Sequence, residues 1–390
     1  MPSERAARIR EYLESAQDDS VRFLKRLVVA ESPSDDPASQ AVVQRILAAE
    51  LKRSRFRIRY MAGTTTGGHL LAVPRSRKKG APIQLVIGHT DTVWPVGMLE
   101  AMPFELDNGQ IRGPGVYDMK GGLTLLAFAL RALRSLKLKP EVTPVILLNS
   151  DEEVGSHESQ RHINRLAKIA DRVFVLEPSL GRAGRIKTAR KGVGEFAIEV
   201  KGRAAHAGLE PGRGVSAILE LSHLVQRLFE LNSPRDGISV NVGTIDGGLT
   251  TNVVAPDGRI TVEVRVISEQ QGREIEKAIR KLKPVTSGAR LEVIGGVSKP
   301  PLLKTDRNRA LWKVARDAGK ELDLQLRDGL AGGASDGNTT SVHAPTLDGL
   351  GVVGGGAHAI HEFLKVDSLA ERGALLALLL LAPPLAWVED

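Results

Sequence analysis

Histidine and carboxylate side chains follow three short apolar runs in this sequence of 390 residues. The runs, each with the polar residues after it, are Ile83–Ile87 with His89, Val145–Leu148 with the acids 151–153, and Val173–Leu176 with Glu177. Adjacent carboxylates repel one another, so three of them at the end of an apolar run favour a compensating cation. Imidazole and carboxylate groups bind zinc, cobalt and manganese. The pattern therefore predicts a metal site beside the ends of these runs.

Asp91 stands two residues after His89 in the segment GHTDTV. On an extended segment, side chains two residues apart point to the same side. A metal-bound imidazole commonly donates its second ring N–H to a carboxylate, which fixes the orientation of the ring. His89 is therefore a candidate metal ligand that Asp91 would orient, but a histidine at a strand end is more often an ordinary polar residue, and both interpretations stay open here.

Asp118 lies in the glycine-rich segment RGPGVYDMKGG, directly before an apolar stretch that predicts a helix over Leu123–Leu130. One interpretation is an ordinary helix N-cap, because Asp is favoured there and the helix dipole stabilises a carboxylate. The other is a carboxylate that bridges two divalent ions roughly 3.5–4 Å apart, with one oxygen on each. The sequence leaves both interpretations open.

Glu152 and Glu153 are neighbours, and neighbouring side chains cannot adopt the same geometry toward a metal. The economical division gives one glutamate to a metal and leaves the other as general base, whereas the plainer alternative is a solvated acidic loop. Near the C-terminus, the segment GAHAIHEF offers His358 and His361 as separate candidates. They do not form the HExxH motif of zinc proteases, because Lys365 occupies its second histidine position.

The composition limits the class of protein. There are no cysteines, so any metal must be held by nitrogen and oxygen atoms. The net charge of +8 could indicate a nucleic-acid partner, but acids are interleaved with the bases and aromatic residues make up only 4% of the chain. With few rings on which bases could stack, we expect no nucleic-acid partner.

The lengths of the apolar runs also indicate where in the cell the protein is located. The N-terminal residues lack the apolar stretch of a secretory signal. No apolar run approaches the roughly 20 residues that span a bilayer. We therefore expect a cytoplasmic protein without a membrane segment.

The first fifty residues carry the apolar spacing of two helices, and short apolar runs then alternate with helical stretches up to about residue 190. Strands that alternate with helices predict an α/β unit, with a mostly parallel twisted sheet and helices on both faces. The sites of such sheets lie at the C-terminal ends of the strands. The predicted metal ligands stand at that edge.

The pattern changes at residue 191. Up to residue 299, alternating apolar strands and two helical stretches predict an α+β unit, with an antiparallel sheet and two helices on one face. The chain then returns to a helix, a strand, a glycine-rich region and a final helix from about Asp367. We therefore predict that 1–190 and 300–390 form one catalytic domain and that 191–299 is an inserted domain.

Taken together, these motifs resemble those of the dinuclear zinc aminoacylase and carboxypeptidase family, which includes glutamate carboxypeptidase, succinyl-diaminopimelate desuccinylase and acetylornithine deacetylase. The matching segments, in the order of the family, are GHTDTV, GPGVYDMKGG, NSDEEVGS, VLEPS, RAAHAG, TNVVAPDGRITVEVR, GGASDGN and GAHAIHE. They look most similar to those of glutamate carboxypeptidase. The resemblance implies two Zn²⁺ ions per subunit, with Co²⁺ or Mn²⁺ as possible substitutes.

The resemblance also implies which residues bind the metals. His89 and Glu177 would bind one zinc ion. Glu153 and His358 would bind the other. Asp118 would bridge the two ions.

Further roles come from the same resemblance. It implies that Glu152 is the general base and that Asp91 orients the histidine of the first metal. His358 is preferred to His361 because the last ligand of the family stands four residues before a glutamate, which here is Glu362.

The inserted segment resembles the dimerisation domain of the family, so a homodimer is expected. His206 in AHAG resembles the histidine that reaches across a dimer to stabilise the oxyanion, and Asn252 in TNVV resembles the asparagine that contacts the substrate carboxylate. Arg265 is a candidate for contact with the partner or the substrate. Where glutamate carboxypeptidase has a carboxylate-binding arginine, this chain offers only Lys299, which lacks the planar two-pronged fit.

The expected function is metal-dependent hydrolysis of an amide bond in a small peptide or N-acyl amino acid. We predict a carboxypeptidase that releases a C-terminal amino acid of the glutamate type. The alternative is an N-acyl amino acid deacetylase or desuccinylase of the acetylornithine or diaminopimelate type. A protein that binds metal and ligand without catalysis is a more remote alternative, because neither the base nor a ligand is missing.

Overall fold

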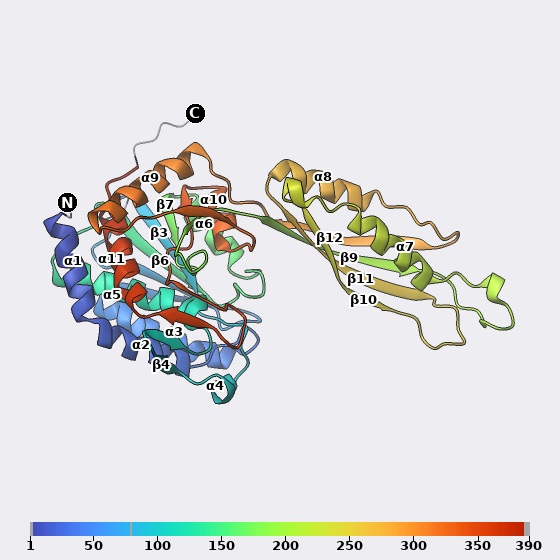
Figure 1. Ribbon diagram of the computed structural model, residues 1–390, viewed down its shortest axis with the longest axis horizontal. Coiled ribbons are helices and arrows are strands. Elements are labelled where there is room, and N and C mark those ends of the chain that lie inside the picture. The colour runs from blue at the N-terminus through green and yellow to red at the C-terminus, as the bar shows by residue number, and fades with distance from the viewer. Residues whose placement is uncertain (1–2, 79, 386–390) are drawn as a thin grey trace. The chain divides into compact units, whose positions relative to one another are not determined.

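The computed structural model describes residues 3–78 and 80–385. The chain divides into two compact units (Figure 1). Unit 1 contains the residues up to 189, 304–330 and those from 335 onward, and unit 2 contains 190–303 and 331–334. The chain therefore leaves unit 1 twice and returns to it twice.

A six-stranded sheet forms the centre of unit 1. Its strands, in spatial order, are β1 (Phe56–Met61), β2 (His69–Pro74), β6 (Thr143–Asn149), β3 (Ile83–His89), β7 (Ala170–Val175) and β14 (Thr346–Leu347). β3 pairs in parallel with β6 and β7, and β7 pairs in parallel with β14, whereas β1 and β2 run antiparallel to their neighbours. The prediction of a mostly parallel sheet is confirmed.

Helices cover both faces of this sheet (Figure 1). Leu85 and Ile87 of β3 pack in an apolar cluster that includes Ile163 of helix α6 (Gln160–Ala167). Val86, between them, packs in a larger cluster with residues of α5 (Gly121–Ser135) and α11 (Asp367–Leu381). Successive side chains of a strand point to opposite faces, so β3 is buried along its whole length.

Three helices open the chain, whereas two were predicted. They are α1 (Glu4–Ser15), α2 (Gln17–Val29) and α3 (Pro37–Arg53). Only Ala16 separates α1 from α2, and its N–H bonds back to the carbonyls of Tyr12 and Glu14. Asp18 and Asp19 favour a new helix start, because a helix N-terminus stabilises negative charge. No glycine or proline marks the break, so the apolar spacing runs across it.

Short elements complete unit 1. A small sheet has the order β15 (Gly354–Gly355), β16 (Phe363–Lys365), β5 (Gln110–Arg112) and β4 (Glu105–Asp107). It places the glycine-rich C-terminal region beside residues 105–112. The remaining helices are α4 (Met98–Ala101), α9 (Asp306–Glu321) and α10 (Asp336–Ser341), and the strands β8 (Ile186–Arg190) and β13 (Asp328–Ala331) pair with each other.

Unit 2 is a four-stranded antiparallel sheet with two helices. The strands, in spatial order, are β10 (Ser239–Gly247), β11 (Asp257–Val266), β9 (Gly192–Lys201) and β12 (Arg290–Lys299). α7 (Ala217–Phe229) and α8 (Glu269–Arg280) pack on it through one apolar cluster that includes Phe196, Leu224 and Ile279. Ser216 and Ser268 cap the two helices with their side chains. The predicted α+β character is confirmed.

Within residues 3–78 and 80–385, every helix is too short or too polar to cross a bilayer.

Candidate metal centre

His89 is the last residue of β3, and its side chain is almost completely buried. The ring Nδ1 lies 3.0 Å from the backbone oxygen of Asp91 and 3.5 Å from its Oδ1. The Asp91 carboxylate also accepts hydrogen bonds from Ser34 Oγ, at 2.8 Å, and from the Glu153 N–H, at 3.2 Å. Asp91 thus contacts the ring of His89 and links it to the loop that follows β6.

Asp118 lies in the turn Val116–Lys120 that precedes α5, at a kink where its own backbone is not helical. Its Oδ1 is 3.2 Å from His89 Nε2, and its Oδ2 is 3.7 Å from His358 Nε2. The residue at the N-cap of α5 is Lys120, and no side chain caps that helix. The N-cap interpretation of Asp118 is therefore wrong, and each of its oxygens faces a different imidazole.

Glu177 and Glu152 lie on the His89 side of Asp118. Glu177 Oε1 is 3.5 Å from His89 Nε2. A Glu152 oxygen lies within 4.8 Å of the candidate ligand atoms of His89 and Glu177. The parallel pairing of β3 with β7 and β6 explains why residues beyond these three strand ends meet.

Glu153 contacts His358, and one of its oxygens also lies within 4.8 Å of the candidate ligand atoms of His89 and Asp118. Glu153 Oε2 is 3.1 Å from His358 Nε2. Glu153 Oε1 is buried and has no hydrogen-bond partner among the described residues. An unpaired carboxylate oxygen in a buried position is costly unless a cation binds it.

The cluster matches the donor set of a metal centre. The closest contacts between candidate ligand atoms span 3.1 to 3.7 Å. Ligands held tetrahedrally at about 2.0–2.2 Å from one ion would lie roughly 3.3–3.6 Å apart. The four contacts bracket this range, so the spacing of the candidate ligands is compatible with metal binding.

The charged groups of the cluster, together with their burial, shift one another's pKa values. Burial lowers the pKa of His89, but the carboxylates of Asp118, Asp91 and Glu177 outweigh it and hold that pKa well above the ordinary value. The hydrogen bond to Glu153 raises the pKa of His358 to about 9. Burial raises the pKa of Glu153.

We predict that metal binding to the stripped protein strengthens as the pH rises from 6.5 to about 9, because His358 must lose its proton to become a ligand. Chelator competition at several pH values, with an indicator for released protons, measures the effect. A His162→Asn variant is the control, because His162 lies outside the cluster. Affinity independent of pH over this range, with no protons released, would contradict the prediction.

Two neighbours of the cluster, Lys187 and Glu362, were not predicted from the sequence. Lys187 Nζ lies 3.7 Å from Glu177 Oε2, and nothing in the alternation of β8 marks this lysine. Glu362 was used only as a marker for His358, yet it is fully buried and accepts four N–H donors. Burial raises the pKa of Glu362 to about 7, although these donors oppose the shift.

The residues predicted to contact substrate all lie in unit 2. His206 is exposed, and Asn252 lies next to it, since the Ala207 N–H donates to the Asn252 carbonyl at 2.9 Å. Arg265 donates to both oxygens of Glu263 and to the Gly332 carbonyl.

Lys299 is largely buried at the end of β12. The roles of these four residues stay predictions.

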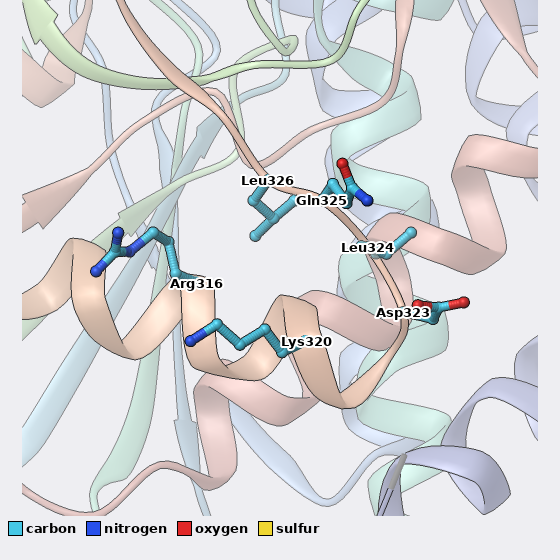
Figure 2. A pocket seen from close by; sticks show the side chains of 6 residues that line it. All are labelled: Arg316, Lys320, Asp323, Leu324, Gln325 and Leu326. Carbon is cyan, nitrogen blue, oxygen red and sulfur yellow. The ribbon is translucent and has the colours of Figure 1, made fainter. Parts of the chain in front are cut away.

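A pocket of about 380 Å³ lies at the end of α9 and in the segment after it (Figure 2). Its lining residues are Arg316, Lys320, Asp323, Leu324, Gln325 and Leu326. No predicted site residue lines it, so it is separate from the candidate metal centre.

The α/β sheet carries at its strand ends a histidine and carboxylate cluster that could hold metal ions. The chain belongs to peptidase family M20/M25/M40, whose sequence pattern matches residues 85–382. It is therefore a metallopeptidase-type hydrolase, as predicted, and the non-catalytic alternative is not supported.

Curated relatives extend over most of the chain. Carboxypeptidase G2 of Pseudomonas sp. (strain RS-16) is 26% identical over 370 residues, which cover 93% of this chain and 88% of that protein. Acetylornithine deacetylase of Myxococcus xanthus is 27% identical, over 79% of this chain and 82% of that protein.

Solved structures show the same fold. Aminopeptidase PepT from Bacillus cereus superposes with a TM-score of 0.74 and 22% identity, over 95% of this chain and 98% of that chain. The M20 family metallo-carboxypeptidase Sso-CP2 from Sulfolobus solfataricus gives a TM-score of 0.68 and 16% identity, over 93% and 98%.

Proposed function

We propose that the protein is a dinuclear zinc carboxypeptidase that releases a C-terminal amino acid of the glutamate type. The observation that carries the dinuclear assignment is the position of Asp118, whose two oxygens face His89 and His358 separately. The length of the match to carboxypeptidase G2 supports the choice of a carboxypeptidase. Cobalt or manganese could replace zinc, because the ligands are all nitrogen and oxygen.

The proposed ligands divide into two sets around Asp118. His89 and Glu177 hold one ion. Glu153 and His358 hold the other. The contacts of 3.1 and 3.5 Å within these pairs support the division.

The proposed reaction is hydrolysis of an amide. Two bound ions would supply the Lewis-acid chemistry that lowers the pKa of a water molecule toward about 7. Glu152 takes a proton from the attacking water at its carboxylate and later donates it to the leaving amine. Asp91 keeps the His89 ring in place through its contact with Nδ1.

Four residues of unit 2 are proposed to contact the substrate or the partner subunit. His206 donates a hydrogen bond to the oxyanion, a contact worth on the order of 3–4 kcal/mol. Asn252 and Lys299 contact the substrate carboxylate. Arg265, which pairs with Glu263, contacts the partner subunit or the substrate.

A substrate panel tests the proposed specificity. N-acylglutamates, dipeptides, N-acetylornithine and N-succinyl-diaminopimelate would be assayed with zinc, cobalt or manganese. We expect the highest kcat/KM with substrates that carry a C-terminal glutamate. Preference for N-acetylornithine or N-succinyl-diaminopimelate would establish the deacetylase or desuccinylase alternative, which the likeness to acetylornithine deacetylase keeps open.

We also propose that the protein is a cytoplasmic homodimer that associates through unit 2. β10 is an edge strand of the unit 2 sheet. Apolar side chains exposed on this unit include Ile218 and Leu219 of α7, Ile245 of β10, and Leu249. An unpaired strand edge beside exposed apolar side chains favours association.

A mixing experiment tests whether His206 acts across such a dimer. Neither Glu152→Gln nor His206→Ala homodimers should turn over substrate efficiently. If His206 serves the partner subunit, re-assembling the two variants in equal amounts restores about a quarter of wild-type activity, because half of the dimers then carry one complete site. Mixtures as inactive as their parents would place His206 in its own subunit's site.

A further inference from the structure

Glu362 has an unusual set of contacts for a residue outside the proposed ligand set. Its Oε1 accepts from the N–H groups of Tyr117, at 2.8 Å, and Asp118, at 3.0 Å. Its Oε2 accepts from Trp94 Nε1, at 2.8 Å, and from the Gly115 N–H, at 2.9 Å. The side chain is fully buried, so these four donors replace solvent entirely.

The four donors belong to two segments that carry proposed ligands. Trp94 stands five residues after His89, in the chain that leaves β3. The other three donors lie in the turn that presents Asp118. Glu362 itself stands four residues after His358, so one carboxylate joins three ligand-bearing segments.

The chemistry of these contacts requires a carboxylate. Both oxygens accept two N–H groups each, and an ionised carboxylate forms shorter and stronger hydrogen bonds than a neutral acceptor. A glutamine would turn an NH₂ group toward two of the donors. The turn that holds Asp118 would then lose acceptors for its N–H groups. Buried backbone N–H groups need such acceptors.

We propose that Glu362 is a positioning residue that fixes the Asp118 carboxylate between the two metal positions and ties it to the His358 loop. This inference rests on the proposed dinuclear centre. Partners outside the ligand set commonly change metal affinity by about 10–100-fold when they are replaced. We expect replacement of Glu362 to weaken the binding of both ions, because Asp118 faces both histidines.

The test compares Glu362→Gln with Glu220→Gln. Glu220 is an equally buried glutamate that accepts the N–H groups of Val285 and Thr286, but it belongs to unit 2, whereas the proposed ligands belong to unit 1. Both full-length variants would be stripped and titrated with Zn²⁺ against a chelator, and their Co²⁺ absorption spectra recorded. Thermal unfolding of the stripped proteins reports on folding.

We expect Glu362→Gln to bind both ions about 10–100-fold more weakly and to show an altered Co²⁺ spectrum, with Glu220→Gln unchanged on both counts. Trp94→Phe removes one donor and keeps an aromatic ring, so a smaller loss in the same direction is expected even if the first variant fails to fold. Wild-type affinity and spectrum in folded Glu362→Gln, or in Trp94→Phe when that variant alone folds, would overturn the inference. Wild-type protein that binds fewer than two ions would instead overturn the dinuclear proposal.

Discussion

Replacement of Glu152 by glutamine is expected to lower kcat by about 10²–10⁴-fold, the range that a general acid or base usually contributes. Metal content should stay at the wild-type level, because the proposed ligand beside His358 is Glu153. Steady-state kinetics and elemental analysis of the same preparation measure the two effects.

A glutamate far from the cluster provides the control. Glu141 is exposed between α5 and β6, and Glu141→Gln should match the wild type in both measurements. Substantial turnover by metal-replete Glu152→Gln would exclude Glu152 as the base. Lost metal together with lost turnover would place Glu152 among the ligands instead, as its distance from His89 and Glu177 would permit.

Replacement of Asp118 by alanine is expected to lower the affinity for both metal ions. His358→Ala should lower the affinity for only one of them. Asp118 faces both imidazoles, and His358 contacts only one side of the cluster. The affinity for each affected ion should fall by more than the roughly 10–100-fold that follows replacement of a residue that only contacts a ligand. Zinc stoichiometry after dialysis against a graded series of chelator concentrations measures the effect.

The exposed Asp107 of β4 supplies the matched control, and Asp107→Ala should retain both ions. If Asp118→Ala lost a single ion while His358→Ala lost the other, the two metals would be held independently. That outcome would contradict a bridging role for Asp118.

The central strands could be predicted because burial on both faces leaves a continuous apolar run. Ile83–Ile87 became β3, which is buried at every position. The sequence marks the boundaries of helices less clearly. The break at Ala16 depends on backbone geometry and not on a residue type that ends helices, so it was missed.

The site could be predicted where the chemistry follows a strand end. His89 and Glu177 meet because β3 and β7 are parallel neighbours, with Ile87 opposite Val175. Residue types alone could not choose between His358 and His361, and the resemblance made that choice. The structure places His358 against Glu153.

The contacts of Glu362 were beyond reach of the sequence. Its donors stand between 244 and 268 residues earlier in the chain, so no local pattern connects them. The small sheet that pairs β16 with β5 brings these segments together. The contacts of Glu362 therefore become visible only in the assembled fold, and its own segment gives no sign of them.

Zinc-edge anomalous diffraction from crystals grown with zinc tests the central claim most directly. We predict two peaks per subunit, about 3.5–4 Å apart, on either side of the Asp118 carboxylate. One peak should lie against His89 and Glu177, and the other against Glu153 and His358. A single peak in this cluster, or a pair of peaks that Asp118 does not bridge, would contradict the account.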